Sequence, residues 1–74
     1  MLTDDQAKTA IAKNVSRILE EQDRSVYWLM KELGVGQGTI YPIVSGAVVP
    51  SVGIAARIAE ILGVTVDRLL DSKK

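Results

Sequence analysis

The chain has 74 residues, a formal net charge of zero, and no histidine or cysteine. This length limits it to one small domain, and a hydrophobic content of 47% allows a core held by packing alone, because disulfides and thiolate metal sites are excluded. No serine has a histidine base and no phosphate-loop context is present, so we expect neither an enzyme nor a bound cofactor.

Two features bear on location. Residues 1–5 are acidic and lack an apolar segment, so a signal peptide is not expected. The longest uncharged run, residues 33–56, contains five glycines and two prolines, which argues against a membrane-spanning helix. These patterns predict a cytoplasmic protein.

The first predicted helix begins after Thr3 and ends at about Gln22. Thr3 and Gln6 have the spacing of a capping box. Apolar residues recur at helical intervals and are expected to face the core. They are Ala7, Ile11, Val15, Ile18 and Leu19.

Two further helices have recognisable starts and ends. Ser25 can cap a second helix that Gly34 terminates. Ser51 can cap another, which Gly63 stops and which is apolar almost all round, so we expect it in the middle of the domain.

The last helix is predicted to be short and capped by Thr65, with its apolar residues facing inward. These are Val66, Leu69 and Leu70. Residues 71–74 are expected to be a frayed tail.

Residues 37–46 are harder to interpret because Pro42 falls inside the expected third helix. Proline removes one backbone hydrogen bond and strikes the carbonyl four residues back, here that of Gly38. We expect a short, kinked helix in which Gly38 absorbs the strain. The alternative is a helix that starts anew with Pro42 near its first position.

The ordered segments resemble the helix-turn-helix domains of lambdoid phage repressors and Cro proteins, the xenobiotic-response-element class of bacterial regulators. The resemblance covers about residues 11–70, and a leucine-glycine-valine turn recurs at 33–35 and 62–64. It is carried by "IAKNVSRILEEQ", "KELGVGQGTI", "SGAVVPS" and "RIAEILGVTVDRLL". It implies a compact all-α five-helix bundle filling residues 1–74 as one domain, with the helix-turn-helix at about residues 25–46.

The resemblance also implies a function: a sequence-specific DNA-binding transcriptional regulator, a repressor that reads the major groove with its short third helix. Mapped by position, the exposed side of that helix would face the bases, and Gln37 is the best candidate for reading adenine. The candidate DNA-binding residues are Ser25, Gln37, Gly38, Thr39, Tyr41, Ser45, Lys13, Arg17 and Lys31. The expected partner is a pseudo-palindromic DNA operator in the nucleoid, bound by a weak homodimer that pairs through Val66, Leu70 and the turn at 63–65.

The charge pattern departs from the family. The loop after the third helix often carries lysine or arginine in the family, but here it is Ala47-Val48-Val49, and no charge occurs from residue 33 to 56. The basic residues lie in the first two helices, where they either approach the DNA backbone or form a solvated face with the neighbouring carboxylates.

A second function stays open for this reason. The same fold with an eroded DNA surface would be a protein-interaction module, such as an antitoxin-like or partner-binding regulator. Its surface would be an apolar patch comprising Trp28, Tyr41, Val44, Val48 and Val49, with Tyr27 beside it. Packing of one ring of the Tyr27–Trp28 pair against the first helix is the structural alternative.

Overall fold

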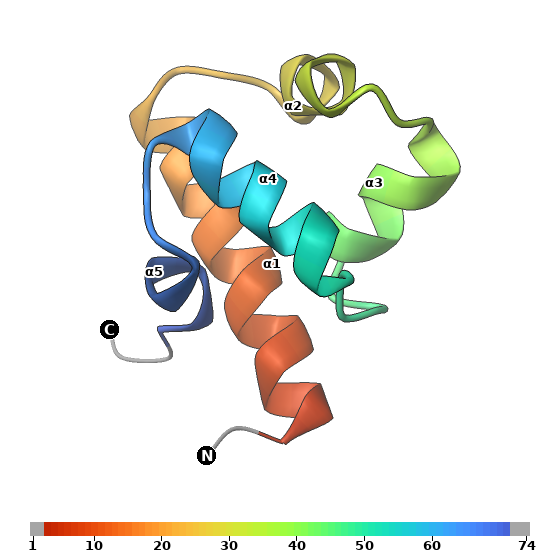
Figure 1. Cartoon of the computed structure of the whole chain (residues 1–74), viewed down its shortest axis with the longest axis vertical. Helices are drawn as coiled ribbons and strands as arrows, with labels where there is room; N and C mark the ends of the chain where they lie inside the picture. The colour runs from red at the N-terminus through yellow and green to blue at the C-terminus, as the bar shows by residue number, and fades with distance from the viewer. Residues whose placement is uncertain (1–2, 72–74) are drawn as a thin grey trace.

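The computed structural model describes residues 3–71, which form five α-helices and no strand (Figure 1). The helices are α1 (Asp4–Glu21), α2 (Val26–Leu33), α3 (Gln37–Val44), α4 (Val52–Leu62) and α5 (Val66–Leu70). The all-α, five-helix prediction is therefore confirmed. The predicted frayed tail lies outside the described residues, apart from Asp71.

The helix starts form as local sequence predicts. Thr3 Oγ1 accepts a hydrogen bond from the Gln6 N–H, and Gln6 Oε1 accepts one from the Thr3 N–H, which completes the capping box. The side chains of Ser25, Ser51 and Thr65 accept from the third backbone N–H of their helices. These bonds satisfy amides that have no partner inside the helix.

The carboxyl-terminal ends of α2 and α4 are also determined by local sequence. Gly34 and Gly63 have φ angles of 74° and 75°, the left-handed conformation that glycine adopts without a steric penalty. In both cases the glycine is followed by a valine whose N–H bonds back to the helix. The repeated leucine-glycine-valine turn thus ends both helices in the same way.

One side chain from each helix meets in the core. Val15, Leu29, Ile40, Ile58 and Leu69 are each at most 1% exposed. The long α1 contacts α3 and α5, while α2 contacts α3 and α4, and α4 contacts α5 (Figure 1). Two successive helices, α2 and α3, are joined only by residues 34–36, so their relative position is constrained by a short connection.

Pro42 lies inside α3, which runs through it without interruption. The alternative in which a helix starts anew at Pro42 is wrong. Pro42 is near the carboxyl-terminal end of an eight-residue helix, so it removes one intrahelical bond, to the carbonyl of Gly38. Gly38 is exposed, so water can donate a hydrogen bond to its carbonyl oxygen in place of the missing N–H.

Two expectations about burial were wrong. Helix α4 is not enclosed on all sides: Ile58, Ala59 and Leu62 are buried, but Val52 is 87% exposed. Val66 does not face inward and is 38% exposed. Both valines are the first residue of their helix, directly after the cap.

No helix among residues 3–71 combines the length and apolar character needed to cross a membrane. Over the same residues, no group of carboxylates is placed to hold a metal ion.

Candidate nucleic-acid interface

The two sides of α3 differ sharply in exposure. Ile40 and Ile43 are buried in the core, whereas Gln37, Gly38, Thr39 and Tyr41 are exposed. The sequence predicted this division, and the structure confirms it. Helix α3 therefore exposes an amide, a hydroxyl and a phenol to solvent, while its two buried isoleucines hold it against the core.

The amino-terminal end of α3 is open. Gly36 provides the cap position, with no side-chain hydrogen bond to the first turn, and no acidic residue lies there. A Cβ atom added at Gly36 or Gly38 would meet nothing within 4 Å. Without a side-chain cap or an acidic residue, this end keeps the weakly positive character of a helix N-terminus.

At the other end of α3, residues of α1 and of the turn after α3 line an open hollow of about 470 Å³. Its lining residues are Thr9, Ala12, Lys13, Ser16, Arg17, Val44, Ser45 and Gly46. Three predicted DNA-binding residues, Lys13, Arg17 and Ser45, are therefore brought together. The Ser45 Oγ donates a hydrogen bond to the Pro42 carbonyl oxygen at 3.2 Å.

Close packing of the turn on α1 forms this hollow. Gly46 has a φ angle of 83°, and a Cβ atom added to it would lie 3.6 Å from Ala12 Cβ. The chain after α3 consequently runs directly against α1. Thr9 and Ser16 were not among the predicted site residues, although residues 9, 13, 16 and 17 have the spacing of one helix face.

Lys13 and Arg17 have no ion-pair partner among the described residues, although the sequence suggested that carboxylates would compete for them. Glu20 and Glu21 follow Arg17 at helical spacing, yet no contact of 4.0 Å or less forms. Lys8 behaves differently, with its Nζ 3.7 Å from an Asp5 carboxylate oxygen.

Other predicted residues lie elsewhere. Lys31 is on α2, with its Nζ 5.6 Å from the centroid of the Tyr27 ring, and it does not line the hollow. Ser25 caps α2 through a 3.0 Å bond from the Trp28 N–H. The nine candidates therefore divide into the α3 surface, the hollow, and two residues on or beside α2.

The proposed apolar patch is only partly assembled. Tyr41, Val48 and Val49 are exposed, and Val44 is half-buried and lines the hollow. Trp28 was wrongly included, because it packs against the core and the Arg24 guanidinium lies 4.1 Å from its ring centroid.

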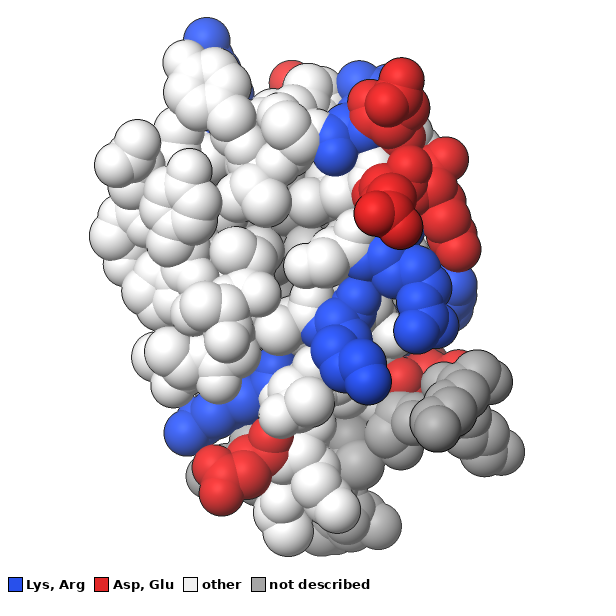
Figure 2. All heavy atoms as spheres, turned by 180° about the vertical axis from the view of Figure 1, so that it is seen from behind, with Lys and Arg blue, Asp and Glu red and all other residues white. Residues whose placement is uncertain are grey.

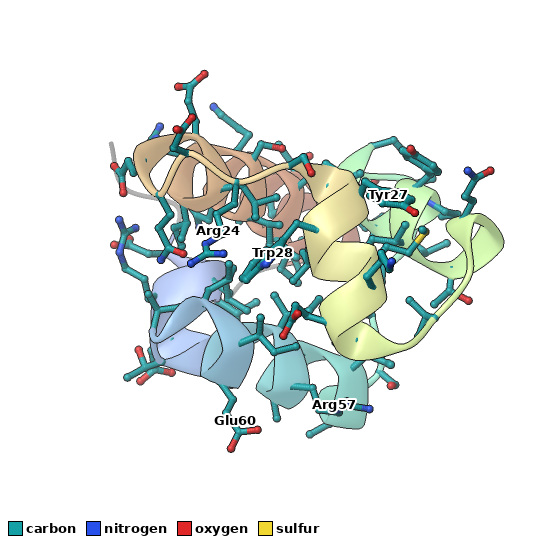
Figure 3. The ribbon with its side chains drawn as sticks, turned by 90° about the horizontal axis from the view of Figure 1, so that it is seen from above. Arg24, Tyr27, Trp28, Arg57 and Glu60 are labelled. Atoms are coloured by element: carbon teal, nitrogen blue, oxygen red, sulfur yellow. The ribbon has the colours of Figure 1, made fainter. Side chains whose placement is uncertain are left out.

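In Figure 3, Trp28 and Tyr27 project from different sides of α2, with Trp28 on the side of Arg24 and Tyr27 toward α3. Adjacent residues on a helix point about 100° apart, and the placement of α2 gives the two rings different surroundings. Val52, the most exposed large apolar side chain among the described residues, was not part of the predicted patch.

Charged side chains gather on one side of the molecule, and the side that carries α3 has few of them. In Figure 2, which shows the molecule from behind, many lysine, arginine, aspartate and glutamate side chains crowd together on the right. A broad uncharged surface covers the left, which is the side of α3 in this view, because Figure 1 places α3 on the right. Residues 33–56, which include all of α3, carry no charge. The hollow thus lies where the uncharged surface meets the basic residues of α1. Comparison with protein-family models, curated proteins and solved structures finds no match to this chain.

Proposed function

We propose that this chain is a sequence-specific regulator that binds double-stranded DNA, with α2 and α3 as a helix-turn-helix and α3 in the major groove. The observation that carries the proposal is the division of α3 into a buried isoleucine side and an exposed polar side. It adds to the resemblance to phage-repressor and Cro domains.

The dimensions of α3 suit a groove. An α-helix with its side chains is about 10–12 Å across, which fits a major groove about 12 Å wide, and eight residues give α3 a length of about 12 Å. Gln37, at the amino-terminal end, has an amide that can pair with the N6 and N7 atoms of adenine. Thr39 can hydrogen-bond to base edges, and the Tyr41 ring offers apolar contact to a thymine methyl group.

Regulation would follow from occupancy of an operator. We propose a cytoplasmic, nucleoid-associated repressor that binds as a weak homodimer, with half-sites about one helical turn apart. Such a geometry predicts a pseudo-palindromic operator.

Selection from a random duplex pool tests this function directly. The expected result is enrichment of a pseudo-palindrome, and Q37A should then relax the preference at one position per half-site by about 1–3 kcal/mol. R57Q is a suitable control, because Arg57 is exposed and projects from α4 away from α3 (Figure 3). It should leave the enriched sequence unchanged.

Salt dependence provides a second measurement. With two or three cationic contacts per protomer, the slope of log affinity against log salt should be shallow, about −4 to −5 for a dimer. A much steeper slope would mean that more lysines and arginines reach phosphates than the charge distribution indicates.

The second candidate function is a protein-interaction module. It is favoured by the exposed apolar side chains Tyr41, Val48, Val49 and Val52, in a segment without charge. Absence of any enriched sequence, together with no duplex binding at low salt, would replace the DNA-binding proposal with this one.

A further inference from the structure

The hollow between α1 and the end of α3 has the chemistry of an anion site. It combines two cationic side chains, Lys13 and Arg17, with the hydroxyls of Thr9, Ser16 and Ser45. None of its lining residues is acidic. Phosphate oxygens accept hydrogen bonds from all of these groups, and arginine in particular matches their geometry.

The two cationic side chains also lack an ionic or aromatic partner among the described residues. Among residues 3–71, neither Lys13 nor Arg17 is within 4.0 Å of a carboxylate oxygen or stacked on an aromatic ring. By contrast, Arg24 lies over Trp28 and Lys31 is near Tyr27. A phosphate entering the hollow would therefore not have to displace an existing ionic partner.

The location of the hollow connects it to α3. Val44, Ser45 and Gly46, at the carboxyl-terminal end of α3, form one wall, while Gln37 lies at the opposite end. The two ends are about 12 Å apart along the helix axis, which exceeds the depth of the major groove, about 8.5 Å. When Gln37 meets base edges, the hollow is consequently near the backbone that borders the groove.

We infer that Lys13 and Arg17, aided by the hydroxyls of the hollow, bind a backbone phosphate of the DNA and supply the ionic anchoring that α3 lacks. This inference rests on the proposed DNA-binding function. It assigns α3 to base reading and α1 to backbone binding, so removal of the cations should weaken binding to all sequences alike.

A structural role for the same cations must be distinguished from phosphate binding. Positive charge near the carboxyl-terminal end of a helix stabilises that helix through its dipole. Loss of Lys13 or Arg17 could then weaken DNA binding only by loosening α3. The salt slope separates the two roles, because a loosened helix does not release fewer counterions per bound phosphate.

The test compares R17Q with R57Q, which each remove one positive charge from an exposed helical arginine. Binding to the duplex selected by the wild-type protein is titrated at several salt concentrations, and thermal melting is recorded for each variant. R17Q should flatten the slope by about 1 per protomer, hence about 2 for a dimer, and R57Q should not. The wild-type ratio of affinities between about 50 and 200 mM salt would then shrink by roughly tenfold in R17Q.

Each outcome has a distinct meaning. An R17Q slope equal to that of R57Q, with wild-type binding intact, would overturn the phosphate site but leave the proposed function standing. A change in the sequence enriched by R17Q would also overturn it, because it would place Arg17 on bases. No wild-type binding to any duplex would instead overturn the proposed function. K13Q, measured in the same way, provides the same comparison if R17Q does not fold.

Discussion

Replacing Asn14 by alanine should destabilise the domain more than any other single polar substitution on α1. Asn14 is 4% exposed, and its Nδ2 donates to the Leu69 carbonyl oxygen at 2.8 Å and to the Asp71 carbonyl oxygen at 2.7 Å. These carbonyls lie at the carboxyl-terminal end of α5, where no backbone N–H of the helix is left to bond to them. Asn14 therefore fastens the last helix to the first.

The expected cost follows from those two bonds. Each contributes about 0.5–1.5 kcal/mol net, so N14A should lower the free energy of unfolding by about 1–3 kcal/mol. A chain of this size is stabilised by roughly 4–11 kcal/mol in total. A loss of about 2 kcal/mol would lower the melting temperature by about 8–16 °C.

Circular dichroism during heating measures this change, and E20A, on the exposed side of α1, is the control and should remain within about 0.5 kcal/mol of wild type. Hydrogen exchange of the α5 amides should accelerate in N14A. A melting temperature within 2 °C of wild type, at about equal α5 exchange rates, would refute the argument that Asn14 holds α5.

N14D sharpens the test, because it keeps the shape of the side chain but replaces the donor by a carboxylate. Two carbonyl oxygens facing that carboxylate would raise its pKa in the folded state. The resulting penalty is absent below the unfolded-state pKa and grows as the pH rises through the folded-state pKa. N14D should therefore be less stable than N14A at neutral pH and recover in acid, which denaturant unfolding at several pH values would detect.

Three further substitutions test other parts of the molecule. P42Q restores an N–H opposite the Gly38 carbonyl and should raise stability by up to about 3 kcal/mol in thermal melts; a loss would show that the fixed dihedral of Pro42 suits α3. Affinity for the selected duplex should be measured beside it, because a gain in stability with weaker binding would mean that Pro42 shapes the binding surface. S51A removes the acceptor of the 3.2 Å bond from the Ile54 N–H and should cost about 1 kcal/mol in denaturant unfolding; an unchanged midpoint would show that water replaces this cap. V66E places a charge on the exposed residue of the predicted pairing surface and should abolish dimer formation on DNA, as measured by sedimentation; a wild-type protein that is monomeric both free and on DNA would contradict the dimer itself.

Helix boundaries were predictable because their causes are close together in the chain. The hydroxyl of Ser25 reaches an amide three residues away, and Gly34 ends α2 through its own backbone conformation. Neither depends on the rest of the molecule. The exposure of Gln37 and Thr39 opposite Ile40 was equally predictable, since helical spacing separates them once α3 forms.

Burial and neighbourhood required the tertiary structure. The apolar composition of α4 did not reveal that Val52 faces solvent, because exposure depends on which helices pack against its first turn. Trp28 and Tyr27 are adjacent in sequence, but the placement of α2 sends their rings to different surroundings.

The hollow and the Asn14 bonds are determined at the longest range. Arg17 meets Ser45 only because the turn after α3 packs on α1, and Asn14 reaches the Leu69 carbonyl across a sequence separation of 55 residues. Local sequence thus determined where each helix begins and ends, because caps act within a few residues. Packing of the hydrophobic core decided which polar side chains meet, because it alone fixes the positions of helices that are distant in the chain.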